Sequence, residues 1–217
     1  MEKKLIKKND FVEIEFTART KEGKVFDTTS AEVAKLAGLY DENTKDNFKN
    51  FKICVGQGMI LEGLDLSLEN KEINKEYEIE LPPEKAFGKR HPELVKLVPS
   101  KMFLEKNIFP KPGMVFSLDG ILIKIISVSG GRVLIDMNNP LAGKEVIYKF
   151  KALRFIEDIK EKAEILEKFM LKANSEIRVD GKKLILSVKV DIPEQFKKNF
   201  SEKVKSILDL EVEFNKI

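Results

Sequence analysis

Residues 51–68, FKICVGQGMILEGLDLSL, constrain the fold of this chain more than any other segment. A short β-type run at 51–55 meets a Gly-x-Gly sequence, and glycine supplies the backbone angles that a sharp corner needs. The apolar residues that follow recur at helical spacing: Ile60, Leu61, Leu64 and Leu68. The segment therefore predicts a strand that turns abruptly into a short apolar helix.

The glycines of this segment do not match a nucleotide-binding loop. Residues 58–63 have the GxxxxG spacing of a Walker A loop, but Leu64 and Asp65 stand where Lys and Ser or Thr are required. Glu62 and Asp65 would also bring negative charge beside a phosphate, and Leu61 replaces the third glycine of the dinucleotide fingerprint. We therefore do not expect nucleotide binding.

Composition excludes several other classes of function. The 39 basic and 36 acidic side chains are mixed and leave a net charge of +3, which gives no bulk electrostatic reason to bind nucleic acid. Cys54 is the only cysteine, so an internal disulfide is impossible, and its place in a predicted strand indicates a core residue. The only histidine, His91, lies in a charged linker. We expect no metal site, no cofactor and no His-based triad.

The N-terminus, MEKKLIKKNDFVEIEF, lacks the apolar core of a signal peptide. Nothing in the chain approaches the run of about 18 apolar residues that a membrane-spanning helix needs. We therefore expect a soluble, cytoplasmic protein that makes no contact with a membrane.

Alternation of apolar and polar residues predicts strands on both sides of the opening segment. Residues 11–19 alternate, 25–29 resume extended structure after a turn, and 76–81 alternate again until Pro82-Pro83. Residues 31–50 are polar and predict a long surface excursion around one helical turn.

The composition changes at Lys89. Residues 94–137 carry many apolar residues in short runs separated by turn signals, with a hairpin at 129–132. Pro92 and Pro140 bound this stretch, which predicts a small β-rich module.

Residues 144–155 return to strand character, and 156–217 predict the order α-β-β-α-β. A helix is expected from Ile156, strands at 176–180 and 183–190, a second helix at Pro193 and a last strand near 210–214.

Four separated segments resemble the FKBP-type peptidyl-prolyl isomerases: VEIEFTART, VFDTT, FKICVGQGMILEGLDLSL and LPPEKAFG, in family order over residues 11–88. NNPLAGKEVIYKF is similar to the stretch where SlyD-like isomerase-chaperones re-enter that fold after a domain inserted into the flap. The resemblance covers about the first 155 residues. The segment at 31–50 and the C-terminal third look like those of the long archaeal members.

The resemblance implies an α+β fold with three domains. Residues 1–88 and 139–155 would form an FKBP-like antiparallel half-barrel with its short helix, the isomerase domain. Residues 89–138 would be the inserted β-rich chaperone domain, and 156–217 a C-terminal α-β-β-α-β domain.

The resemblance also implies an apolar pocket that takes a proline ring. By position, the catalytic residues would be Asp27, Ile60, Leu64, Phe87 and Tyr148, and the pocket would be lined further by Phe16, Phe26, Phe51, Leu61 and Leu141. Three positions depart from the usual pattern: Leu64 stands where many members have Trp, Phe87 where Tyr is usual, and Tyr148 where Phe is usual. Asp27 could equally be a turn residue that bonds its own backbone.

The implied function is peptidyl-prolyl cis–trans isomerisation combined with chaperone activity on unfolded or nascent polypeptides that contain X-Pro bonds. The alternative is a catalytically weak holdase whose pocket mainly binds clients. The insert has more apolar residues than about 45 residues can bury, which favours an exposed client-binding surface there. The alternative is that these side chains pack against the half-barrel or the C-terminal domain. Lys197-Lys198 is typical of a solvated helix face, so attachment to RNA is not expected.

The first C-terminal helix carries two adjacent apolar stripes, Ile156/Ile159/Ala163/Leu166/Met170 and Ile165/Phe169/Ala173. One small sheet covers about one of them. The second stripe must meet the rest of the chain, another copy of the protein or a client. We expect 156–217 to be an autonomous domain that helps hold clients, with a homodimer through the same face as the alternative.

Overall fold

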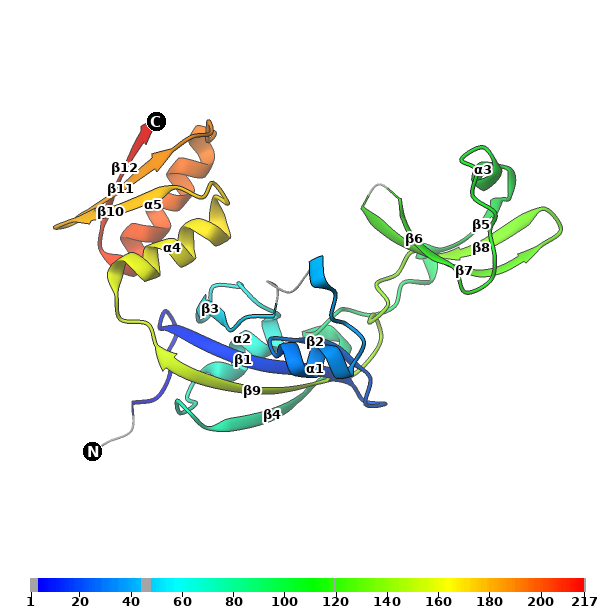
Figure 1. The fold of residues 1–217 in the computed structure, drawn as a ribbon, viewed down its shortest axis with the longest axis horizontal. Coiled ribbons are helices and arrows are strands. Elements are labelled where there is room, and N and C mark those ends of the chain that lie inside the picture. The colour runs from blue at the N-terminus through cyan, green and yellow to red at the C-terminus, as the bar shows by residue number, and fades with distance from the viewer. Residues whose placement is uncertain (1–3, 44–47, 119, 217) are drawn as a thin grey trace. The chain divides into compact units, whose positions relative to one another are not determined.

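The computed structural model describes residues 4–43, 48–118 and 120–216. The chain forms two compact units, which Figure 1 shows as ribbons. The first unit contains Met1–Glu80 and Val146–Ile217, and the second contains Leu81–Glu145. The second unit is thus inserted into the first between two strands of its sheet.

The first unit is built on a five-stranded antiparallel sheet. The central strand β1 (Phe11–Thr20) pairs with β2 (Val25–Thr28), β3 (Phe51–Cys54) and β9 (Val146–Phe155). Strand β4 (Glu76–Leu81) lies beside β9. A short helix, α1 (Ala31–Leu36), follows β2. The predicted strands and the helical turn near 31–37 are therefore confirmed.

The corner after β3 is closed by a buried carboxylate. Gly56 and Gly58 adopt φ angles of +75° and +66°, which an L side chain rarely takes. Their N–H groups donate to the two oxygens of buried Asp65 at 2.8 and 2.9 Å. The backbone donors that would face a phosphate in a nucleotide-binding loop are thus occupied by this chain's own side chain.

The helix α2 spans Glu62–Leu68, so the expectation that Ile60 and Leu61 lie within it is wrong. Leu61 has extended backbone angles, and its carbonyl accepts the first helical hydrogen bonds from Leu64 and Asp65. Because the hydrogen bonds to Asp65 fix the Gly-x-Gly corner in a non-helical conformation, the helix begins after that corner, at Glu62.

The second unit is a four-stranded antiparallel sheet in the order β5-β8-β7-β6. Its elements are β5 (Val95–Pro99), α3 (Lys101–Leu104), β6 (Val115–Leu118), β7 (Ile121–Ser129) and β8 (Arg132–Asp136). The predicted hairpin links β7 to β8 through two glycines with positive φ. Five buried apolar side chains form its core: Phe103, Ile123, Ile125, Val133 and Ile135.

Buried polar groups join the two chain segments at the base of the second unit. The side chain of Asn138 accepts a hydrogen bond from the His91 N–H at 2.8 Å and donates one to the His91 carbonyl at 3.0 Å. Asp136 accepts from the Asn138 amide at 2.8 Å and forms an ion pair with Arg90. His91, expected in a charged linker, thus forms backbone hydrogen bonds with Asn138, which the sequence alone did not predict.

The C-terminal part of the first unit has the predicted order α-β-β-α-β. Its sheet order is β10 (Glu176–Asp180), β11 (Lys183–Val188) and β12 (Glu211–Lys216), with β12 parallel to β11. The helices are α4 (Ile159–Met170) and α5 (Glu194–Leu208). The expected start of the first helix at Ile156 is wrong, because Asp158 caps it by accepting the Glu161 N–H at 2.7 Å.

Helix α4 packs both within the C-terminal part and against the strands that precede it. One apolar cluster contains Ala163, Ile165 and Leu166 of the helix together with Phe11 and Cys54 of β1 and β3. Ile165 of the second stripe thus belongs to the same buried cluster as residues of β1 and β3. The exposed Phe169 belongs to the same stripe. Autonomous folding of 156–217 and dimerisation through this face stay predictions.

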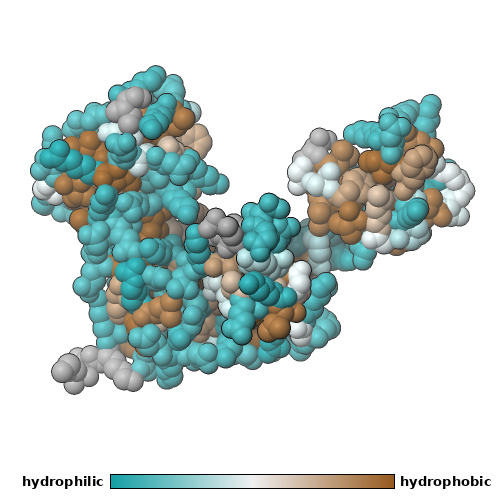
Figure 2. All heavy atoms as spheres, viewed as in Figure 1, coloured by the Kyte–Doolittle hydropathy of each residue, from teal (hydrophilic) through white to brown (hydrophobic). Residues whose placement is uncertain are grey.

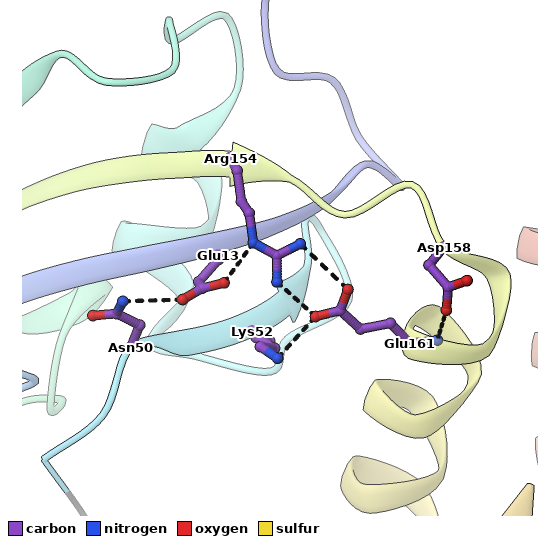
Figure 3. Close-up of polar contacts among 6 residues, drawn as sticks. All are labelled: Glu13, Asn50, Lys52, Arg154, Asp158 and Glu161. Carbon is purple, nitrogen blue, oxygen red and sulfur yellow. Dashed lines mark hydrogen bonds and ion pairs between the residues drawn. The ribbon is translucent and has the colours of Figure 1, made fainter.

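A charged network also joins α4 to the sheet (Figure 3). The guanidinium of Arg154 on β9 donates to Glu13 on β1 at 2.8 Å and to both oxygens of Glu161 on α4 at 2.7 and 3.3 Å. Lys52 on β3 lies 2.8 Å from Glu161. The hydrogen bonds from Arg154 and Lys52 lower the pKa of Glu161 from 4.5 to about 2.

Removing the Asp65 carboxylate should destabilise the fold. In Asp65→Ala the N–H groups of Gly56 and Gly58 lose their acceptor, and we expect the free energy of unfolding in urea to fall by about 3 kcal/mol. Glu62→Ala, at an exposed position of the same helix, is the matched control and should change stability by less than about 0.5 kcal/mol. Equal effects of the two substitutions would contradict the assigned role of Asp65.

The Arg154 network should make stability depend on pH in the acid range. Glu161 has a lower pKa in the folded state than in the unfolded state, so its ionised form stabilises the fold above pH 4.5, and this contribution is lost as the pH falls toward 2. The difference in unfolding free energy between wild type and Glu161→Gln should be constant above about pH 5 and shrink in more acid solution.

The control for this titration is Glu164→Gln. Glu164 lies on the same helix in a surface pair with Lys160 at 3.9 Å, so its removal should have little effect at any pH. A difference between wild type and Glu161→Gln that does not change with pH would contradict a charge-based role for the network.

Candidate functional site

The two faces of β1 and β9 differ in polarity. Phe16 lies opposite Phe150, and Ala18 opposite Tyr148, so these four side chains share one face of the sheet. The other face carries ion pairs, such as Lys151 with Glu15 at 2.7 Å. The alternation that predicted β1 thus separates an apolar inner face from a charged outer face.

Three aromatic rings from three strands meet on the inner face. The ring centroid of Tyr148 lies 5.8 Å from that of Phe16 and 6.2 Å from that of Phe26, the latter in an edge-on arrangement. Tyr148 is only 4% exposed. The structure therefore brings together three of the side chains expected in the pocket.

Asp27 and Tyr148 flank the same small residue. Ala18 on β1 pairs with Asp27 on β2 and with Tyr148 on β9. Partial burial raises the pKa of Asp27, although a hydrogen bond from the Thr28 backbone opposes this effect and the side chain keeps contact with solvent. Burial and the negative charge of Asp27 raise the pKa of Tyr148. Asp27 thus bonds its local backbone and also acts electrostatically on the ring cluster.

The segment around the start of α2 contributes a buried side chain and a backbone donor. Leu64 is 1% exposed, and Ile60 and Leu61 are partly buried. The N–H of Ile60 donates no hydrogen bond to any of the residues that the structure describes. Phe51 lies opposite Ile14 of β1 and is 46% exposed, so one of its sides is open to solvent.

Phe87 and Leu141 belong to the second unit, where both are partly buried. Phe87 follows a 3₁₀ turn at Pro83–Lys85, and Leu141 donates its N–H to the Asn139 side chain at 2.8 Å. Their part in the pocket stays a prediction.

A hollow of about 370 Å³ in the first unit is lined by Phe16 and Phe150 but mainly by polar and charged residues, among them Glu15, Glu76 and Lys149. Within the described residues, no three His, Cys, Asp or Glu side chains are grouped so that they could hold a metal ion. The described helices include none that is long and apolar enough to cross a membrane.

Comparison with known proteins gives two family matches. The family described as FKBP-type peptidyl-prolyl cis-trans isomerase matches residues 2–105, and the family described as FKBP26, IF domain matches residues 96–141.

Curated relatives are also similar to this chain. The short-type peptidyl-prolyl cis-trans isomerase of Methanocaldococcus jannaschii is 35% identical over 147 residues, which cover 68% of this chain and 92% of that protein. The FKBP-type isomerase SlyD of Treponema pallidum is 28% identical over 142 residues, covering 64% of this chain and 71% of the relative.

Proposed function

This chain belongs to the FKBP-type peptidyl-prolyl cis–trans isomerases, and we propose that it is a folding enzyme with two working surfaces. The ring cluster of the first unit isomerises X-Pro bonds, and the exposed apolar surface of the second unit holds the unfolded or nascent polypeptide that contains them.

The ring cluster suits the chemistry of prolyl isomerisation. No covalent bond is broken; the obstacle is amide resonance, with a barrier of about 20 kcal/mol. A twisted amide separates less charge than a planar one, so an apolar enclosure favours it. A thousandfold acceleration requires only about 4 kcal/mol of such preference. The observation that carries the proposal is the meeting of Phe16, Phe26 and Tyr148 from three separate strands.

We assign a separate role in this pocket to each of the following groups. Leu64 forms its floor, and the unpaired N–H of Ile60 holds a substrate carbonyl. Asp27 is the carboxylate at the wall, with Phe51 and Leu61 at the rim.

The surface of the second unit supports client binding. Among the described residues, more than half of the exposed large apolar side chains lie in this unit, which is less than a third of the chain. Phe109 is 71% exposed, and Leu97 and Met102 are each 56% exposed. Hydrophobic surface on the second unit is visible in Figure 2. Contiguous apolar surface of this kind is typical of interaction sites.

The alternative function, a holdase with little catalytic activity, rests on the same apolar surface but gives the ring cluster only a binding role. Turnover of short proline peptides separates the two functions, because a holdase would leave their isomerisation rate unchanged.

Charge at the pocket floor should abolish catalysis. Leu64→Arg would place an uncompensated cation in a buried apolar site, and we expect turnover of proline-containing tetrapeptides to fall by roughly a hundredfold or more. Leu66→Arg is the matched control, since Leu66 lies on the same helix and is 54% exposed. Circular dichroism would verify that both variants fold. Unchanged turnover in a folded Leu64→Arg variant would mean that the pocket is elsewhere.

The second unit should be needed only for large substrates. The triple variant Leu97→Ser, Met102→Ser and Phe109→Ser removes exposed apolar area without touching the buried core. We expect tetrapeptide turnover to be unchanged and catalysis of a proline-limited refolding reaction to fall by roughly tenfold, because the local client concentration is lost.

The control for the triple variant is Leu36→Ser, which removes a side chain that is 84% exposed on the first unit. It should spare refolding catalysis and suppression of aggregation. If the triple variant lost tetrapeptide turnover as much as refolding catalysis, the second unit would be part of the catalytic structure instead.

A further inference from the structure

Tyr148 carries the one hydroxyl among the three rings of the cluster. Its ring is buried against Phe16 and Phe26, neither of which offers a polar atom. Buried tyrosines normally find a hydrogen-bond partner for the hydroxyl. The Tyr148 hydroxyl has no such partner among the residues that the structure describes.

This hydroxyl is also not sealed inside the protein. Thr20 Oγ1 is the fully enclosed side-chain oxygen that lacks a partner in the described part of the chain. The Tyr148 oxygen does not share that condition, so it keeps some solvent-accessible surface although the residue as a whole is 4% exposed. A donor that is unpaired and reachable in an otherwise apolar site is available to a ligand.

Tyr77, in the same unit, is a tyrosine whose hydroxyl is hydrogen-bonded within the fold. Its ring stacks on Phe150 at 5.8 Å, and its hydroxyl accepts the Glu72 N–H at 3.1 Å. The Tyr77 hydroxyl is therefore used by the fold, whereas that of Tyr148 is not.

The surroundings keep Tyr148 in its donor form. The negative charge of Asp27 and burial both oppose ionisation of the phenol, which raises its pKa. Ala18, whose side chain is a single methyl group, lies between the two residues in the sheet. An ionised Asp27 can only accept hydrogen bonds, so Tyr148 is the side-chain donor of this cluster.

We propose that the Tyr148 hydroxyl donates a hydrogen bond to the prolyl nitrogen as the amide twists, an inference that rests on the proposed function of the pocket. In the planar amide the nitrogen lone pair is delocalised and accepts poorly. In the twisted amide it is localised and accepts well. The hydrogen bond therefore forms in the transition state and not in the ground state, so it raises kcat and leaves KM unchanged.

This donor acts separately from the Ile60 N–H. The backbone group binds a carbonyl that is present throughout the reaction, so it contributes to KM. The hydroxyl of Tyr148 acts only on the nitrogen that changes during twisting. The pocket thus divides ground-state binding and transition-state stabilisation between two donors.

Tyr148→Phe tests the inference with the loss of one oxygen atom. We expect kcat for a proline tetrapeptide to fall about fivefold to tenfold, the effect of one hydrogen bond, with KM unchanged. Because the hydroxyl has no partner in the folded chain, stability in urea should not decrease. Tyr77→Phe is the matched control and should lose stability while keeping kcat.

Three results for Tyr148→Phe would contradict the inference. Unchanged kcat in Tyr148→Phe would mean that the hydroxyl does not act in catalysis, and a rise in KM alone would mean that it binds the ground state. A loss of stability comparable to that of Tyr77→Phe would assign the hydroxyl to the fold. Failure of the proposed function is recognised separately, because Leu64→Arg would then also keep full turnover.

Discussion

The pairing of β1 with β9 is the interaction on which the rest of the structure depends. Residues 11–20 and 146–155 form the longest ladder of the first unit, although most of the chain separates them in sequence. Because β9 also lies beside β4, the chain can leave the sheet after β4 and return at the neighbouring strand. Loop-closure entropy grows only slowly with loop length, so residues 81–145 can be inserted there at little cost to the sheet.

The same ladder brings the rings of the cluster together. Its register places Tyr148 opposite Ala18, and the pairing of β1 with β2 places Asp27 on the other side of that alanine. A shift of β9 by one residue relative to β1 would turn Tyr148 away from Phe16 to the charged face. Arg154 near the end of β9 then reaches Glu13 of β1 and Glu161 of α4, so one strand connects the inner face of the sheet with the C-terminal helices.

Local patterns were sufficient to predict the strands, because alternation along 11–19 and 76–81 reports burial directly, and glycine marked the corner after β3. The helix starts could not be read from periodicity, since Asp158 and the Asp65-bound corner determine them. The hydrogen bond from His91 to Asn138 joins residues 47 positions apart, and no local sequence pattern predicts such a contact. Candidate pocket residues were identified through the family resemblance alone, because a single buried Phe or Tyr is equally typical of a core.

The corner after β3 combines backbone N–H groups that are bonded to Asp65 with a nearby N–H that is not bonded. Asp65 has two carboxylate oxygens, and both are used by the N–H groups of Gly56 and Gly58. The N–H of Ile60, which we propose holds the substrate carbonyl, lies before the first turn of α2 and is left without an acceptor among the described residues. The stabilising hydrogen bonds of the corner therefore hold an unpaired donor in a fixed position. Such preorganisation lets a donor act on a substrate without first reorganising the protein.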